Sequence, residues 1–151
     1  ILFGAANTFG RILTMNRVPT MITDWMLSIT SSRAMIMLMI NIALLIIGMF
    51  LDTISSIVLF GPIFAPIAIA IGYDPLHFGI IMVINLCIGM ITPPMGGNLF
   101  VAQRVSKTSF EEIFKDTFPM IIVLYILLAL LIIFPEITMF LPKLLGYTFT
   151  G

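Results

Sequence analysis

The stretch GMITPPMGGNLF, residues 89–100, decides the fold that this sequence predicts. It places two prolines and three glycines inside a long apolar segment. Proline lacks a backbone donor and clashes with the turn before it, and glycine weakens a helix interior. A segment that only had to cross a membrane has no use for such a break. We therefore expect a transmembrane helix over residues 77–105 that is broken at Pro93 and Pro94.

The composition indicates a membrane protein. Of the 151 residues, 60% are hydrophobic and only 9% are charged, whereas a soluble domain carries roughly 25% charged residues. We predict an all-α polytopic membrane protein. The net charge of zero argues against a nucleic-acid partner. Cys87 is the one cysteine of the sequence, which excludes an internal disulfide. No nucleophile–base set, P-loop or dinucleotide motif indicates an enzyme.

The chain opens at Ile1 on an apolar stretch, ILFGAANTFG, that has no basic region before it and is not a signal peptide. This stretch is too short to span a bilayer, which takes about 20 apolar residues. We expect the sequence to be the C-terminal part of a longer chain, entered within a helix.

Apolar runs divide the rest of the sequence into segments. Residues 16–33 carry apolar side chains at helical spacing around Trp25, which predicts an interfacial amphipathic arm helix or, alternatively, a helix packed on others. Residues 34–72 hold two apolar runs joined by LDTISS. Because that turn is rich in hydroxyls and lacks Lys and Arg, we favour a re-entrant helical hairpin over two full spans. The other predicted segments are the end of a transmembrane helix over 1–15, a cytoplasmic surface helix over 106–118 with a Ser109–Glu112 capping box, a last transmembrane helix over 119–141 and a periplasmic tail over 142–151.

Basic residues predict the orientation in the membrane. Arg104, Lys107 and Lys115 form the densest basic cluster, and loops rich in Lys and Arg stay in the cytoplasm. Both ends of residues 34–72 and the C-terminus are then expected on the outer side of the membrane.

Asp52 lies at the predicted hairpin tip between two apolar runs. A carboxylate at membrane depth costs at least about 2.5 kcal/mol, so it should face a cavity and have a partner. We expect Asp52, next to Thr53, to support a cation directly or through its field, with Ser55 and Ser56 on the substrate side. The alternative is an Asp that caps the following helix, with the three hydroxyls as local hydrogen-bonding groups.

The break itself offers oxygen ligands. Carbonyls just before Pro93 and Pro94 lose their intrahelical donors and must meet protein, water or a cation. Na⁺ is a hard cation that prefers oxygen. The carbonyls of Gly89 and Met95 and the hydroxyl of Thr92 are placed to surround it.

Beyond the break, Gly96 and Gly97 expose the N-terminus of a second half-helix, whose free N–H groups favour a carboxylate. Asn98 and Asn85, one on each side of the break, could touch the substrate or tie the break to the hairpin. Asn41 is expected to form an interhelical hydrogen bond. A simple proline kink without a binding role is the alternative.

Residues 48–102 carry a resemblance to one family. Three motifs are specific: GMFLD before the hairpin tip, GYDPLHFG between elements and TPPMGGNLFVA at the break. In this order they resemble the C-terminal end of the large permease subunit of the tripartite ATP-independent periplasmic (TRAP) transporters, and the resemblance covers nearly the whole chain. It implies the second inverted repeat of an elevator-type ion transporter, with residues 34–72 and 77–105 as its re-entrant hairpin and broken helix.

The resemblance also implies a function and a site. It implies sodium-driven import of an organic acid, such as sialic acid or a C4-dicarboxylate, across the bacterial inner membrane. Na⁺ is implied as the coupling ion, with Gly48 joining Gly89, Thr92 and Met95 around it and Asp52 holding it through its charge. A small four-helix membrane subunit, separate or fused, and a periplasmic substrate-binding protein are implied as partners.

Two other functions stay open at this point. A stand-alone sodium–carboxylate symporter of the same architecture would need no binding protein. A structural membrane subunit with kinked helices would transport nothing. Sodium-dependent uptake into liposomes would exclude the structural role.

Overall fold

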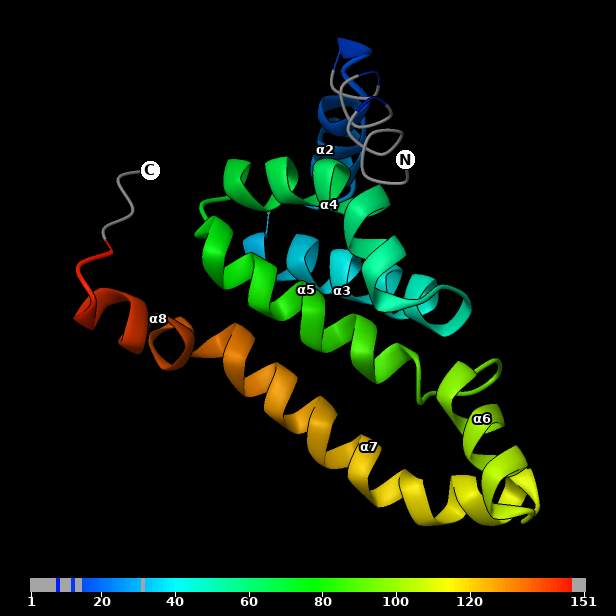
Figure 1. Ribbon diagram of the computed structural model, residues 1–151. Helices are drawn as coiled ribbons and strands as arrows, with labels where there is room; N and C mark the ends of the chain where they lie inside the picture. The colour runs from blue at the N-terminus through cyan, green and yellow to red at the C-terminus, as the bar shows by residue number, and fades with distance from the viewer. Residues whose placement is uncertain (1–7, 9–11, 13–14, 31, 148–151) are drawn as a thin grey trace.

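The computed structural model describes residues 8, 12, 15–30 and 32–147 of the chain. In this part, all regular secondary structure is helical (Figure 1). The predicted helix end over 1–15 falls mostly outside the described residues. The helices are α2 (Val18–Ile29), α3 (Arg33–Phe50), α4 (Thr53–Ala70), α5 (Pro75–Gly89), α6 (Gly97–Ser106), α7 (Phe110–Ile133) and α8 (Pro135–Leu144).

Three of the described helices are long and apolar enough to cross a membrane. Helices α3 and α4 have 18 residues each, with mean hydropathies of 2.2 and 2.0, and α7 has 24 residues with 2.5. Large apolar side chains such as Ile42 on α3 and Val123 on α7 are exposed. Helices that are apolar on their outer as well as their inner faces suit hydrocarbon surroundings. The helices therefore agree with the predicted polytopic membrane protein.

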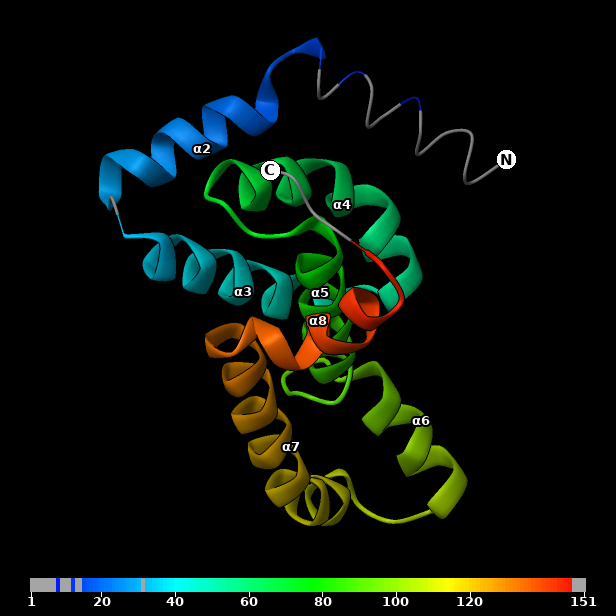
Figure 2. The same cartoon turned by 90° about the vertical axis from the view of Figure 1, so that its left-hand side faces the viewer.

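Helix α5 lies at the centre of the fold. It packs against α3, α4, α7 and α8, with α3 and α4 on one side of it and α7 on another (Figures 1 and 2). Eight of its 15 residues are buried. The hairpin of α3 and α4 turns at Leu51 and Asp52, so that its tip lies near the end of α5 and its base near the start.

A pair of asparagines joins α3 to α5 within the apolar packing. Asn85 Nδ2 donates to the main-chain oxygen of Asn41 at 2.7 Å and to Asn41 Oδ1 at 2.8 Å, and both side chains are buried. Asn41 Nδ2 in turn donates to Met37 O at 2.8 Å. Apolar faces gain little by leaving hydrocarbon for each other, so polar links of this kind help to hold membrane helices together. The predicted interhelical bond of Asn41 is confirmed, and Asn85 ties the central helix to the hairpin.

Helix α4 contains two prolines, Pro62 and Pro66, and it changes direction along its length (Figure 1). Each proline removes one i→i−4 hydrogen bond and pushes the preceding turn away. The bend lets the second arm of the hairpin follow α5 while α2 packs on its outer side. In α2, Met26 is buried whereas Trp25 is 59% exposed. Its position at a membrane interface stays a prediction.

The structure differs from the sequence prediction after residue 106. The Ser109–Glu112 capping box is confirmed, but the helix that it starts runs without interruption to Ile133, rather than ending at 118 before a separate transmembrane helix over 119–141. Pro119 lies inside it and removes only its own hydrogen bond, which helices in membranes tolerate. The helix ends instead before Pro135, because a proline disfavours helical geometry in the residue preceding it. A separate helix, α8, then extends into the predicted tail.

Candidate functional site

The hairpin tip and the break in the central helix meet at Gly48 and Gly89. A Cβ atom added to Gly48 would lie 2.8 Å from the Leu86 carbonyl oxygen, and one added to Gly89 would lie 2.8 Å from the Cα and the carbonyl carbon of Gly48. Such separations are shorter than any side chain tolerates, so the two backbones touch where only glycine fits. The structure thus brings together two of the four residues predicted to surround a cation.

Helix α3 ends beside this contact. Its last backbone hydrogen bond runs from Leu51 N to Ile47 O at 2.9 Å. The carbonyls of Gly48, Met49 and Phe50 lie beyond that bond, and the last carbonyls of a helix have no donor within the helix. The end of the first hairpin arm therefore presents backbone oxygens next to the break.

Asp52 begins the second hairpin arm. Its Oδ2 accepts a hydrogen bond from Ser55 N at 3.0 Å, which is a side-chain N-cap of α4. The capping interaction considered in the sequence analysis is thus present. The cap occupies one carboxylate oxygen, and the negative charge stays at the tip, where Asp52 is exposed.

The hydroxyls that follow Asp52 have different surroundings. Thr53 Oγ1 lies 3.1 Å from Met90 Sδ and 3.8 Å from Cys87 Sγ, so the start of α4 rests against the end of α5. Ser55 is half-buried. Ser56 is fully buried, and its Oγ has no hydrogen-bond partner in the described part of the chain. Buried hydroxyls are normally paired, so Ser56 offers an unused polar group at the tip.

The carbonyls before the prolines keep more partners than the sequence predicts, because the last turn of α5 tightens. Thr92 N donates to Gly89 O at 3.0 Å, and Ile91 N donates to Ile88 O at 3.1 Å. Thr92 Oγ1 also donates to Ile88 O, at 2.7 Å. Since a carbonyl oxygen accepts two hydrogen bonds, Gly89 O keeps one free lone pair. The Thr92 hydroxyl has committed its hydrogen, which leaves its lone pairs for a cation.

The second half of the broken helix is reached through a compact turn. The Pro93–Pro94 peptide is cis, and Gly96 has a left-handed φ of 41°. The chain folds back so that Asn98 N donates to Met90 O at 3.1 Å. The helix N-terminus at Gly96 and Gly97, which was predicted to favour a carboxylate, therefore has fewer free N–H groups than the sequence suggests.

One side of the break is open. The Met95 side chain is 50% exposed, and Gly97 and Asn98 are exposed as well. A Cβ added to Gly97 would have no neighbour within 4 Å. A ligand, or another part of the protein, has access to the site from this side.

Most of the groups that this site can offer to a ligand are oxygen atoms. They are the carbonyls at the end of α3, the free lone pair of Gly89 O and the Thr92 hydroxyl, with the Asp52 charge nearby. A hard cation such as Na⁺ prefers this set of ligands.

The contacts of Gly48 with Leu86 and of Thr53 with Met90 and Cys87 were not predicted from the sequence. These partners lie far apart in the chain, and Leu, Met and Cys are common in any apolar helix. The one available signal was a glycine inside each apolar run, Gly48 in the first and Gly79 and Gly89 in the second, since glycine marks a possible close approach of backbones.

Comparisons with known proteins identify the family to which this chain is similar. The sequence profile of the family described as "Tripartite ATP-independent periplasmic transporter, DctM component" matches residues 1–137. The isethionate TRAP transporter permease protein DctMQ of Oleidesulfovibrio alaskensis is 45% identical over 93% of this chain and 22% of its own length.

Two further relatives also match most of this chain with a minor part of their own length. The sialic acid TRAP transporter large permease protein SiaM of Vibrio cholerae is 39% identical over 92% of this chain and 33% of its own length. The C4-dicarboxylate TRAP transporter large permease protein DctM of Pseudomonas aeruginosa is 38% identical over 97% of this chain and 35% of its own length. The chain thus spans about a third or less of the length of these curated relatives.

Proposed function

This chain belongs to the DctM component family of the tripartite ATP-independent periplasmic transporters, and we propose that it is the C-terminal part of a permease that imports an organic acid together with sodium across the bacterial inner membrane. The relatives are named for isethionate, sialic acid and C4-dicarboxylates, which are all organic anions. An anion that enters against the membrane potential needs a coupling cation.

The observation that carries the proposal is the contact of Gly48 with Gly89. It joins the carbonyl end of one helix to the break of another, and it does so beside the Thr92 hydroxyl. Discontinuous helices in transporters commonly use free backbone oxygens to coordinate Na⁺. We propose Gly48, Gly89, Thr92 and Met95 as the Na⁺ ligands, with Asp52 stabilising the ion by its charge.

The depth of the hairpin supports a re-entrant path. Helix α5 has 15 residues, or about 22 Å at 1.5 Å per residue, which is shorter than the roughly 30 Å hydrocarbon core. Helix α7 has 24 residues, or about 36 Å. Because the hairpin tip contacts the last turn of α5, it reaches no further than the break, and we propose that the tip lies within the membrane rather than at its far surface.

An elevator movement is compatible with these contacts. The glycine contact and the Asn41–Asn85 pair attach the hairpin to the central helix at two positions along α5, Gly89 and Asn85. A body joined in this way can carry its site across the membrane without being taken apart. We propose that α3, α4 and α5 move together in transport.

The partners follow from the family description, which names a tripartite transporter. We propose a small four-helix membrane subunit and a periplasmic substrate-binding protein as the other two parts. With the basic loop around Lys107 in the cytoplasm, the hairpin base and the C-terminus face the periplasm, where a binding protein can deliver substrate.

Uptake into proteoliposomes tests the function. The full-length permease, its small subunit and its binding protein are reconstituted, and uptake of sialic acid, succinate and isethionate is measured with and without an inward Na⁺ gradient. We expect one of these acids to accumulate only with Na⁺ and the binding protein. Uptake without the binding protein would indicate a stand-alone symporter, and no uptake of any acid would favour a structural subunit.

A further inference from the structure

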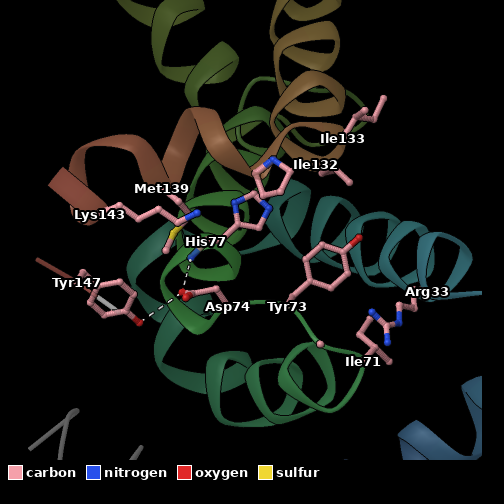
Figure 3. Close-up of a pocket in the computed structure, with 12 residues that line it drawn as sticks. Arg33, Ile71, Tyr73, Asp74, His77, Ile132, Ile133, Met139, Lys143 and Tyr147 are labelled. Atoms are coloured by element: carbon pink, nitrogen blue, oxygen red, sulfur yellow. Dashed lines mark hydrogen bonds between the residues drawn. The ribbon is translucent and has the colours of Figure 1, made fainter. Parts of the chain in front are cut away.

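A groove that changes from polar to apolar along its length runs between α3 and α7. Its polar end is a cavity of about 730 Å³ where α3 and α5 begin and α7 ends, and Arg33 and Tyr73 are among the residues that line it (Figure 3). Its apolar end is a smaller pocket of about 180 Å³ between the middle parts of α3 and α7. Ile132 of α7 lines both hollows, so they adjoin. Together they form what we call the α3–α7 groove.

The apolar end of the groove suits a hydrocarbon chain. Of its three polar side chains, Asn41 and Asn85 bond each other and Tyr125 is half-buried. A third helix is about 10–12 Å across with its side chains, which is too wide for a pocket of this size, whereas a single acyl chain is narrow. The pocket opens outward, because Leu38 and Ile42 are 52% and 50% exposed. Its apolar walls are formed by Leu38, Ile42, Leu45, Leu128, Ala129 and Ile132.

The groove is about as deep as one leaflet of a bilayer. Arg33 is the first residue of α3 and Ile133 is the last of α7, and both helices are long and apolar enough to cross a membrane. From Arg33 to Leu45, α3 rises about 18 Å at 1.5 Å per residue, and half of the hydrocarbon core is roughly 15 Å. The polar end therefore lies at the level of the lipid headgroups, and the apolar end lies at the level of the acyl chains.

The polar end carries two donors that are not engaged. Within the described part of the chain, neither the guanidinium of Arg33 nor the hydroxyl of Tyr73 forms an ion pair or a hydrogen bond. Figure 3 shows both groups on the side of the cavity where Ile132 and Ile133 lie, next to the apolar end of the groove. A guanidinium with free N–H groups matches the oxygens of a phosphate. These donors therefore lie where the phosphate of a lipid in the groove is expected.

The charges around the cavity favour a headgroup with a net negative charge. Lys143 is exposed and, like Arg33, forms no ion pair in the part of the chain that the structure describes. Asp74 is the one acidic side chain that lines the cavity. It accepts hydrogen bonds from Leu76 N at 2.8 Å and from the Tyr147 hydroxyl at 3.4 Å, and in Figure 3 it points toward Tyr147 and away from Arg33. Two cationic groups thus face one carboxylate that is already engaged with donors.

We propose that the α3–α7 groove binds one anionic phospholipid, with its phosphate at Arg33 and Tyr73 and an acyl chain along the apolar end. Basic pockets between membrane helices recognise such headgroups, and tyrosine is enriched at this level of the bilayer. Since α3 and α7 each pack on α5, the lipid joins the first hairpin arm to the last long helix. The proposal requires that these helices lie in a membrane, and it is independent of sodium coupling and of the transported acid.

Native mass spectrometry tests the polar end. The full-length permease with its small subunit is delipidated in detergent and titrated with phosphatidylglycerol or with phosphatidylethanolamine. We expect the first phosphatidylglycerol to bind more tightly than the first phosphatidylethanolamine. Arg33→Gln should weaken phosphatidylglycerol binding about fivefold, the contribution of one basic group near a headgroup, and Arg33→Lys should keep most of the affinity. Arg104→Gln, which removes an exposed cation on α6, is the control and should leave the affinity unchanged.

Two matched variants of α7 test the apolar end. Ala129→Phe fills the pocket and should weaken the binding of both lipids, because each needs that space for its chain. Val123→Phe adds a ring at another exposed position of α7, one that does not line the pocket. It should bind both lipids like the wild type. Circular dichroism and retention of the small subunit check that each variant folds and assembles.

Two results would overturn the proposal. Equal losses in Arg33→Gln and Arg104→Gln would mean that overall charge alone attracts phosphatidylglycerol. Unchanged lipid binding in Ala129→Phe would mean that the groove holds no acyl chain, as expected if another part of the transporter covers it. If Arg33→Gln failed to assemble, the comparison of Ala129→Phe with Val123→Phe would still decide.

Discussion

At the scale of single residues, Asp52 combines a helix cap with a charge, and substitutions can separate the two. Asn caps a helix about as well as Asp, so Asp52→Asn should fold normally and keep its bond to Ser55 N. We expect it to raise the Na⁺ concentration for half-maximal uptake several-fold. Asp52→Ala should in addition lose about 1 kcal/mol of stability with the cap. Na⁺ titration of uptake and thermal unfolding measure the two effects. Wild-type Na⁺ dependence of Asp52→Asn would reduce this residue to a cap.

Substitutions of Thr92 can likewise separate the loss of an oxygen ligand from a change in side-chain shape. Thr92→Val keeps the shape but removes the one side-chain oxygen of the proposed Na⁺ ligands. Losing a good polar contact in a desolvated site costs on the order of 1–3 kcal/mol, or roughly a 5- to 150-fold weaker Na⁺ affinity. Thr92→Ser should retain most of the transport, and Met95→Leu should be mild because the proposed ligand is its carbonyl. All are compared by Na⁺ titration in proteoliposomes.

A matched control for Thr92 exists in α7. Thr117 Oγ1 donates to Ile113 O at 2.8 Å, the same local bond that Thr92 makes to Ile88. Thr117→Val should therefore lose that bond without changing the Na⁺ dependence. If Thr92→Val behaved like wild type while Met95→Leu failed, the cation would bind elsewhere and the break would act only as a hinge.

At the scale of elements, the packing of α3 on α5 depends on two glycines. A Cβ at position 89 would lie 2.8 to 2.9 Å from backbone atoms of Gly48 and Leu45, and a backbone cannot rotate away as a side chain can. We expect Gly89→Ala to separate the hairpin from the break, at a cost of about 1–3 kcal/mol from overpacking. Lower thermal stability and lost uptake would report this.

Gly79→Ala is the control on the same helix. A Cβ there has no neighbour within 4 Å, and alanine favours a helix interior over glycine by up to about 1 kcal/mol. This variant should be neutral or slightly stabilised. Equal melting temperatures for Gly89→Ala and Gly79→Ala would show that the close approach is not required.

At the scale of the whole molecule, the depth of the hairpin tip in the membrane is open to measurement. The exposed Cys87 is first replaced by Ser, and a cysteine is then introduced at Ser55 in the full-length transporter. We expect a membrane-impermeant thiol reagent to label it only through an aqueous cavity whose access changes with Na⁺. A cysteine at Ser106, in the exposed segment before α7, should label freely from the cytoplasmic side. Free labelling of position 55 from that side in every condition would mean two full spans.

Much of this molecule could be predicted from local sequence, because local features act within one turn of chain. Pro93, Pro94 and the flanking glycines predicted the helix break, and Ser109 with Glu112 predicted a helix start that the structure confirms. The apolar runs predicted helices of membrane-spanning length. The break and the capping box each reflect a hydrogen bond gained or lost between residues at most four positions apart, and the apolar runs reflect hydropathy alone.

Local sequence signals gave incorrect predictions for one helix boundary and for the hydrogen bonding of the carbonyls before Pro93. Separate helices were predicted over 106–118 and 119–141, yet α7 passes through Pro119 without a break, since the loss of one hydrogen bond is small in a long apolar helix. The carbonyls before Pro93 looked free. They are partly occupied instead, because donors from Thr92 and Asn98 fold back onto them.

Only the tertiary structure decided which distant residues meet. The sequence by itself determined an apolar, helical chain with one broken helix, because hydropathy and proline chemistry do not depend on the fold. It could not show that Gly48 touches Gly89, or that His77 forms a hydrogen bond with Thr138. Those contacts depend on how whole helices pack, since residues far apart in the chain approach each other only when the surfaces between them fit.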